Sequence, residues 1–151
     1  MKPCRFKLKS GLEVRANEET QAGQVYAQAS AHLEEALSHQ QAVEEAIEGN
    51  LTACQQAFAG QVTIGTLAHL QTALRELRGQ LSQLEPVVAE RQAEANAKRQ
   101  ELFTARRRRE ALEKIRDEQQ SAHDRELART EQQAIDEMVL LREAGGFTQK
   151  C

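Results

Sequence analysis

Residues 67–88 read LAHLQTALRELRGQLSQLEPVV, and this stretch decides the fold. Large aliphatic residues recur in it at alternating intervals of three and four over three heptads. They are Leu67, Leu70, Leu74, Leu77, Leu81, Leu84 and Val88. This spacing places the side chains on one stripe of an α-helix and is typical of a coiled-coil seam. We therefore predict a long helix whose leucine stripe packs in a coiled coil.

The predicted helix extends well beyond this stretch, over residues 66–143. Pro86 falls at an outward-facing heptad position and should kink the helix, because it removes one backbone hydrogen bond. Beyond Pro86 the apolar stripe thins, and it recovers near the end of the helix. The apolar positions of the stripe beyond Pro86 are Ala95, Leu102, Ala105, Leu112, Ile115, Leu127, Ala134, Met138 and Leu141. Gly145 and Gly146 are predicted to end the helix, since Gly is common at helix C-termini.

A first long helix is predicted over residues 11–58, before a turn at 59–65 that is marked by two Gly and β-branched residues. Ser10 followed by Glu13 reads as a capping box at its start. Its apolar stripe is Leu33, Leu37, Val43, Ile47, Leu51, Cys54 and Phe58. Gln40 and Glu44 occupy heptad positions in the middle, where a local stutter is plausible. The stripe continues past Gly49, so we read the helix through that residue.

The chain, residues 1–151, is thus predicted to be a single all-α domain. Two long helices form an antiparallel coiled-coil hairpin, followed by a short C-terminal tail. Folding the chain back near residue 62 brings Leu12 close to Leu112 and leaves residues after about 115 without a partner helix. An unpaired helix of about 25 residues is marginal in water, so this overhang should dock into another protein.

Charge favours the antiparallel pairing. Residues 13–48 hold eight acidic side chains and one basic side chain, whereas residues 75–116 hold eleven basic and seven acidic side chains. An acidic helix beside a basic one favours one alignment over its competitors. Each exposed pair contributes only a few tenths of a kcal/mol, so the charges set register more than stability.

Composition argues against several classes of function. The chain has no Trp, one Tyr and a net charge of −3, which fits a helical rod and lacks the basic excess of a nucleic-acid binder. No phosphate loop, nucleophile motif or Cys/His cluster occurs, so we expect no enzyme, cofactor or metal site. No transmembrane segment or secretory signal is present, and three widely spaced cysteines fit the cytoplasm.

One charged run is unusual. Arg106, Arg107, Arg108 and Arg109 cover all sides of one helical turn, so at least two of them must face away from a partner helix. They form either a solvated face near Glu18 and Glu19 or a patch that binds an acidic protein surface. Nucleic-acid binding is less favoured, because Phe103 is the only aromatic residue nearby for base stacking.

Several motifs together resemble the FliJ family, the small coiled-coil proteins of the bacterial flagellar export apparatus. The opening Phe6, Leu8, Leu12 and Arg15 is similar to the start of that family. Leu102 to Ile115, with its arginine run, is similar to the second-helix motif, although Arg109 and Glu110 stand where Lys is frequent. Glu131, Gln132, Asp136 and Glu137 resemble the C-terminal signature. The resemblance covers nearly the whole chain.

The resemblance implies a soluble stalk that binds the hexameric export ATPase and promotes its assembly and activity. It also implies contacts with the cytoplasmic domain of the export gate membrane protein and with export chaperones. The protein would be monomeric and cytoplasmic, peripherally associated with the inner membrane at the flagellar base without inserting into it. Contact with the ATPase would use both chain ends, at Phe6, Leu8, Leu12, Arg15, Leu127, Glu131, Gln132, Asp136 and Glu137. Contact with the gate would use Leu67, Leu70, Leu74, Leu77 and Leu81, unless these only form the seam.

Two alternatives remain. One is the equivalent stalk of a virulence type III secretion system. The other is a self-associating structural coiled coil, because the weak seam of the first helix could be buried better in an oligomer.

Overall fold

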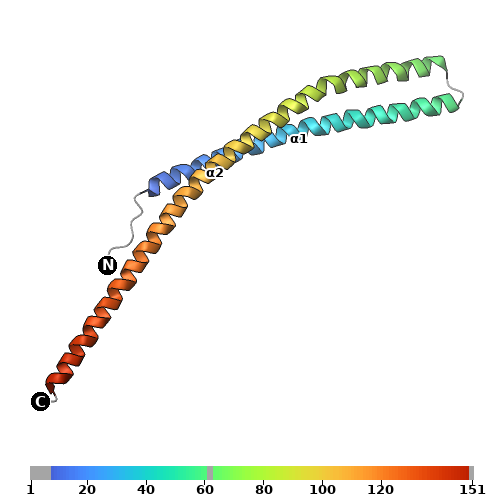
Figure 1. The fold of residues 1–151 in the computed structure, drawn as a ribbon. Coiled ribbons are helices and arrows are strands. Elements are labelled where there is room, and N and C mark those ends of the chain that lie inside the picture. Colours follow the sequence, from blue (N-terminus) through green and yellow to red (C-terminus); the bar gives the residue numbers. More distant parts are fainter. Residues whose placement is uncertain (1–7, 61–62, 150–151) are drawn as a thin grey trace. The chain divides into compact units, whose positions relative to one another are not determined.

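The computed structural model describes residues 8–60 and 63–149, with side chains to residue 145. Within these residues it contains two helices, α1 (Lys9–Ala59) and α2 (Ile64–Gln149), and no strand. The helices pack against each other as a hairpin, and α2 is the longer, with 86 residues against 51 (Figure 1). The predicted all-α hairpin with a longer second helix is therefore confirmed.

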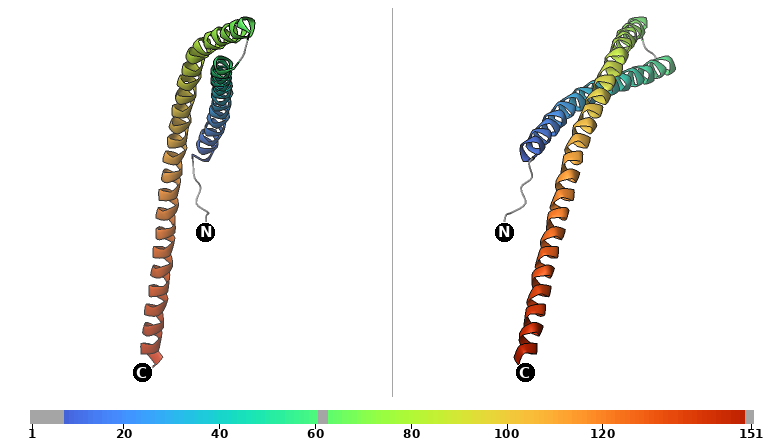
Figure 2. Two further views of the ribbon diagram at one scale, coloured as in Figure 1. Left: turned by 90° about the vertical axis from the view of Figure 1, so that its right-hand side faces the viewer. Right: turned by 60° about the vertical axis from the view of Figure 1, so that its left-hand side comes forward.

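Contacts divide the chain into two compact units, which are described separately. Unit 1 contains residues 1–18 and 105–151, and unit 2 contains residues 19–104. In unit 2, α1 and α2 run alongside each other in the left view of Figure 2 and cross in the right view. The prediction of a single domain over residues 1–151 stays a prediction.

The leucine stripe of α2 forms the seam of unit 2. All seven predicted residues from Leu67 to Val88 are half-buried, while most of their neighbours are exposed. The same spacing continues through Arg91, Ala95 and Lys98 to Leu102. A Cβ atom on Gly23 would lie 3.8 Å from Cδ1 of Leu102, so α1 and α2 pair close to the predicted register.

The seam of α1 differs from the prediction. Leu33, Val43, Ile47 and Cys54 belong to it as expected, but Leu37, Leu51 and Phe58 are exposed at 43%, 39% and 74%. The seam positions are Tyr26, Ala29, Leu33, Ala36, Gln40, Val43, Ile47, Asn50, Cys54 and Ala57. These residues keep intervals of three and four throughout, so the suggested stutter at Gln40 is wrong. Small residues of α1 face the seam because leucines of α2 fill the space between the helices.

The helix ends differ from the predicted bounds by a few residues at most sites. The N–H of Leu12 donates to the carbonyl oxygen of Leu8 at 2.9 Å, so α1 begins before Ser10, which lies inside the first turn. The predicted capping box is therefore wrong. Thr63 instead caps α2, because its Oγ1 accepts a hydrogen bond from the N–H of Thr66 at 3.3 Å.

Glycine and proline inside the helices do not interrupt them. α1 runs through Gly49, and α2 runs through Pro86, which is exposed as predicted. The expected kink at Pro86 stays a prediction. α2 also continues past Gly145 to Gln149, so the predicted helix end at Gly145 and Gly146 is wrong. No described glycine has a positive φ, and without the left-handed conformation a glycine weakens a helix without ending it.

Unit 1 contains the start of α1 and the last part of α2. A Cβ atom on Gly11 would lie 3.9 Å from Cδ1 of Leu112, so residues near Leu12 meet residues near Leu112 as predicted. Ala105 is buried, and Arg15 and Arg109 are half-buried. From residue 114 to residue 145 every side chain is exposed except His123 and Leu127, which are half-buried. We call residues 114–145 the overhang.

Candidate partner-binding surfaces

The residues assigned to ATPase contact fall in unit 1. Leu12 and Arg15 are half-buried against the rest of the unit, and Arg15 pairs with Glu18 at 2.9 Å on the same helix. Leu8 is 44% exposed, and Phe6 lies outside the described residues. The first helix therefore contributes mainly packing here, while Leu8 remains available to a partner.

The C-terminal members of this predicted site lie on the overhang. Glu131, Gln132, Asp136 and Glu137 are exposed, and Leu127 is half-buried. Nε2 of Gln132 donates to Oδ1 of Asp136 at 3.0 Å, which links two of them one turn apart. The structure thus brings the acidic residues onto one short segment of α2.

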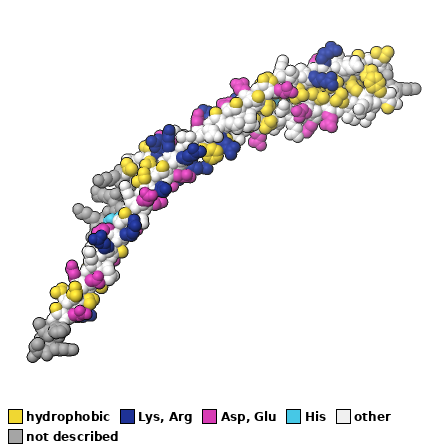
Figure 3. Space-filling model, in the orientation of Figure 1, with side chains coloured by type: hydrophobic (Ala, Val, Ile, Leu, Met, Phe, Trp, Pro, Cys, Tyr) yellow, Lys and Arg dark blue, Asp and Glu magenta, His cyan; other side chains and the backbone are white. Residues whose placement is uncertain are grey.

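An apolar face on the overhang is larger than the sequence reading suggested. Ile135, Met138, Val139, Leu140 and Leu141 are between 49% and 73% exposed. Ile135, Met138 and Val139 surround a shallow hollow together with Arg142. Their intervals of three and four residues give a helix face that fits an apolar groove in a partner. Figure 3 shows hydrophobic side chains on this segment of α2.

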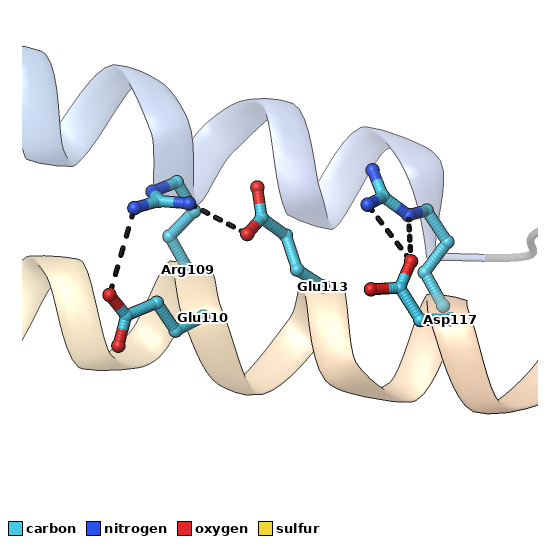
Figure 4. A network of polar contacts seen from close by, with 5 residues as sticks. Arg109, Glu110, Glu113 and Asp117 are labelled. Carbon is cyan, nitrogen blue, oxygen red and sulfur yellow. Dashed lines mark hydrogen bonds and ion pairs between the residues drawn. The ribbon is translucent and has the colours of Figure 1, made fainter.

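The arginine run divides into two parts. Arg109 is half-buried, with its side chain 24% exposed, and pairs with Glu113 at 2.7 Å and with Glu110 at 3.9 Å (Figure 4). Arg106, Arg107 and Arg108 are exposed. Arg109 is thus held by carboxylates of its own helix, whereas the other three are exposed residues on the same turn. Binding of an acidic partner at this run stays a prediction.

The five leucines assigned to gate contact are seam residues. Leu67, Leu70, Leu74, Leu77 and Leu81 are all half-buried between α1 and α2. Only the exposed part of a half-buried seam side chain is available to a partner. The assignment of these leucines to gate contact stays a prediction.

Apolar exposure near these leucines lies instead on three other residues. Phe58 is 74% exposed, Ile64 is 86% exposed and Leu51 is 39% exposed. We call these three residues the tip patch. The sequence pattern predicts Leu51 and Phe58 in the seam. Each of them directly follows a small or polar residue that occupies the actual seam position, and this spacing could have shown that they lie outside the seam. Asn50 precedes Leu51, and Ala57 precedes Phe58.

A shallow groove lies on one flank of unit 2. It is lined by His32, Glu35, Ala36, His39, Leu84, Val87 and Arg91. Arg91 is engaged by Glu94 at 3.4 Å, and both histidines are exposed. Across the described residues, no three His, Cys, Asp or Glu side chains gather closely enough to hold a metal ion. Neither helix has, in its described part, a segment long and apolar enough to cross a bilayer.

Comparison with protein families finds one match over most of the chain. The model of the family described as "Flagellar FliJ protein" matches residues 5–145. Among solved structures, the chain is similar to CT670 of Chlamydia trachomatis, which is described as a proposed homologue of YscO. The identity is 22%, the match covers 92% of this chain and 94% of that chain, and the TM-score is 0.49. Comparison with curated proteins finds no match.

Proposed function

Because the chain belongs to the flagellar FliJ protein family of non-enzymatic export components, we propose that it is the central stalk of the hexameric flagellar export ATPase. In this role it binds the ring through unit 1 and promotes assembly of the hexamer and ATP hydrolysis. It works at the cytoplasmic face of the inner membrane, at the base of the flagellum, without entering the bilayer.

The exposure of the overhang is the observation that carries this proposal. Most helical stability in proteins comes from packing of an apolar face, and nearly all side chains of the overhang are exposed. The overhang presents five large apolar side chains between Ile135 and Leu141, each about half exposed or more. Burying such side chains contributes about 1.5–3 kcal/mol each when the burial is complete. Insertion into a ring of subunits would supply the apolar surface that the described part of the chain does not provide.

The acidic residues of the overhang fit the same role. Glu131, Asp136 and Glu137 are exposed acidic side chains on the overhang. We propose that basic groups of the ATPase bind these carboxylates, and that Leu8, Leu12 and Arg15 position the start of the overhang. The export gate and the export chaperones are proposed as partners of the remaining surfaces, with Arg106–Arg109 as the patch for an acidic partner.

ATP hydrolysis by the purified export ATPase tests the proposal. We expect the full chain to stimulate hydrolysis, and a chain that ends after Ile115 to have no effect. A matched control is Gln119→Ala, which changes an exposed residue of the overhang outside its apolar face. Full stimulation by the truncated chain would show that the overhang does not enter the ring.

Self-association is the second candidate, because several large apolar residues are exposed in the described part of the chain. Phe58 and Ile64 are exposed enough to pack against a second hairpin. Light scattering at working concentration separates the two proposals, because the stalk requires a monomer and the structural coiled coil requires a dimer or larger assembly.

A further inference from the structure

The closed end of the hairpin contains no charged side chain over a long stretch. Residues 49–74 include no Asp, Glu, Lys or Arg, although 28% of the whole chain is charged. The one histidine in this stretch, His69, is exposed. Helix faces that contact solvent normally carry charged side chains. The lack of charge at this end therefore indicates a surface that does more than face solvent.

The same end exposes its largest apolar residues. Phe58 and Ile64 are 74% and 86% exposed, and Leu51 lies two helical turns before Phe58 on the same face of α1. The seam next to them is already complete with Ala57 and Leu67. The fold therefore does not require large apolar side chains at Phe58 and Ile64.

Heptad phase places the three residues on one flank of unit 2. Leu51 and Phe58 directly follow the seam residues Asn50 and Ala57 of α1. Ile64 lies three residues before the seam residue Leu67, which is the corresponding heptad position of α2. In an antiparallel pair these equivalent positions of the two helices lie along the same edge of the seam. Figure 3 shows hydrophobic side chains gathered over this end of the hairpin. The tip patch therefore lies along one edge of the seam, on both helices.

We propose that the tip patch docks into an uncharged apolar groove of a protein partner, and that hydrophobic burial drives this binding with little electrostatic contribution. The cores of protein interfaces are depleted of charged residues and enriched in aromatic ones, as this end is. The inference rests on the proposed function, in which export components bind surfaces outside the overhang. It adds the chemistry of the surface that binds the tip patch.

The surrounding charges argue against two other occupants. Helices that lie on anionic membranes carry Lys or Arg beside their apolar face, whereas the first basic residue after Ile64 is Arg75, about 16 Å further along α2. The charges of α1 nearest to the patch are Glu44, Glu45 and Glu48, and all three are exposed. In a two-fold contact between two tips these carboxylates would approach their counterparts in the second copy. Arg75 and Arg78 of α2 lie at their level and offset only part of this charge.

Binding measurements on the full chain test the inference. The probes are three purified export components: the cytoplasmic domain of the gate protein, an export chaperone and the ATPase. We expect the double variant Phe58→Ser, Ile64→Ser to weaken binding of one of them by about tenfold or more. We also expect that raising the salt concentration from 50 to 500 mM changes that affinity by less than about twofold, because little charge is screened. The matched control is Val25→Ser, Leu37→Ser, which changes two exposed apolar residues of α1 outside the tip patch and the overhang.

The outcomes separate this inference from the proposed function. Binding that depends on the tip patch but occurs with the chaperone supports the inference and removes the gate from the proposed function. Three results would overturn the inference. They are equal affinity of the variant and the wild type for all three probes, a dimer that disappears in the variant, and binding to anionic vesicles that the variant loses. Since both replaced residues are exposed, thermal unfolding should match wild type and confirm that the variant folds.

Discussion

Two segments of the same helix, residues 67–88 and the overhang, carry similar apolar residues in very different surroundings. The leucines of the first segment are half-buried against α1, whereas the large apolar residues near the end of the second are exposed. Both segments have intervals of three and four residues between apolar positions. The spacing of apolar residues therefore does not show whether a stripe is buried against the other helix of the same chain. The lengths of the two helices and the position of the turn decide which stripe is buried.

The comparison assigns the two segments different tasks. Residues 67–88 supply stability to the isolated chain, since burial of their side chains is part of folding. In the proposed function, the overhang gains its apolar burial when the ATPase is bound. Mutations should therefore separate the two segments by their effect on the free energy of unfolding.

The largest difference is expected from shortening one leucine in each segment. Leu77→Ala should lower the free energy of unfolding by about 2 kcal/mol, because it removes a half-buried side chain from the seam and leaves a cavity. Leu141→Ala, at a residue that is 73% exposed, should change it by less than about 0.5 kcal/mol. Urea denaturation monitored by circular dichroism measures both values. Equal losses would mean that the overhang is already packed in the free chain.

A smaller effect is expected at the cap of α2. Thr63→Ala should lower the free energy of unfolding by about 0.5–1 kcal/mol, because the N–H of Thr66 loses its side-chain acceptor. Thr72→Ala is the control, since the hydroxyl of Thr72 only returns a hydrogen bond to the carbonyl of Ala68 inside the helix. If Thr72→Ala destabilised the chain as much as Thr63→Ala, the cap would have no special role.

Glycine in the first helix offers a gain of similar size. Gly49→Ala should raise the free energy of unfolding by about 0.5–1 kcal/mol, because a Cβ atom there meets nothing within 4 Å and alanine favours the helix. Gly79→Ala in α2 has the same open surroundings and should give a similar gain. Destabilisation at Gly49 would indicate that the helix is not continuous there in solution.

The smallest effect is expected from removing the overhang. A chain that ends after Ile115 should unfold at a temperature within a few degrees of the full chain, since nearly all side chains of residues 114–145 are exposed. The loss of helical signal should correspond to the residues removed. A large drop in melting temperature would show that the overhang stabilises the hairpin.

The sequence predicted the hairpin because leucines mark the seam of α2 without ambiguity. It misplaced part of the seam of α1, where Leu37, Leu51 and Phe58 were chosen over Ala36, Asn50 and Ala57. In each pair the seam position holds the smaller or more polar residue, because its partner on α2 is large. Hydrophobicity in one helix alone therefore does not predict the seam positions where the other helix supplies most of the side-chain volume.

The candidate surfaces were predicted less completely. The overhang followed from unequal helix lengths, but its exposed apolar face was only partly recognised through Met138 and Leu141. The tip patch was missed, because exposure of Phe58 and Ile64 depends on the phase of the seam. Helix ends were also uncertain, since capping by Thr63 and the continuation of α2 past Gly145 depend on backbone conformation.

Hydrogen exchange of the free chain and of its complex with the export ATPase, followed by mass spectrometry, tests the contrast within α2 most directly. We predict that amides of residues 67–88 exchange slowly in the free chain and that those of residues 114–145 exchange rapidly. Addition of the ATPase should then protect residues 114–145 and leave residues 67–88 unchanged. Slow exchange of residues 114–145 in the free monomer, equal to that of residues 67–88, would contradict the claim that the overhang depends on a partner.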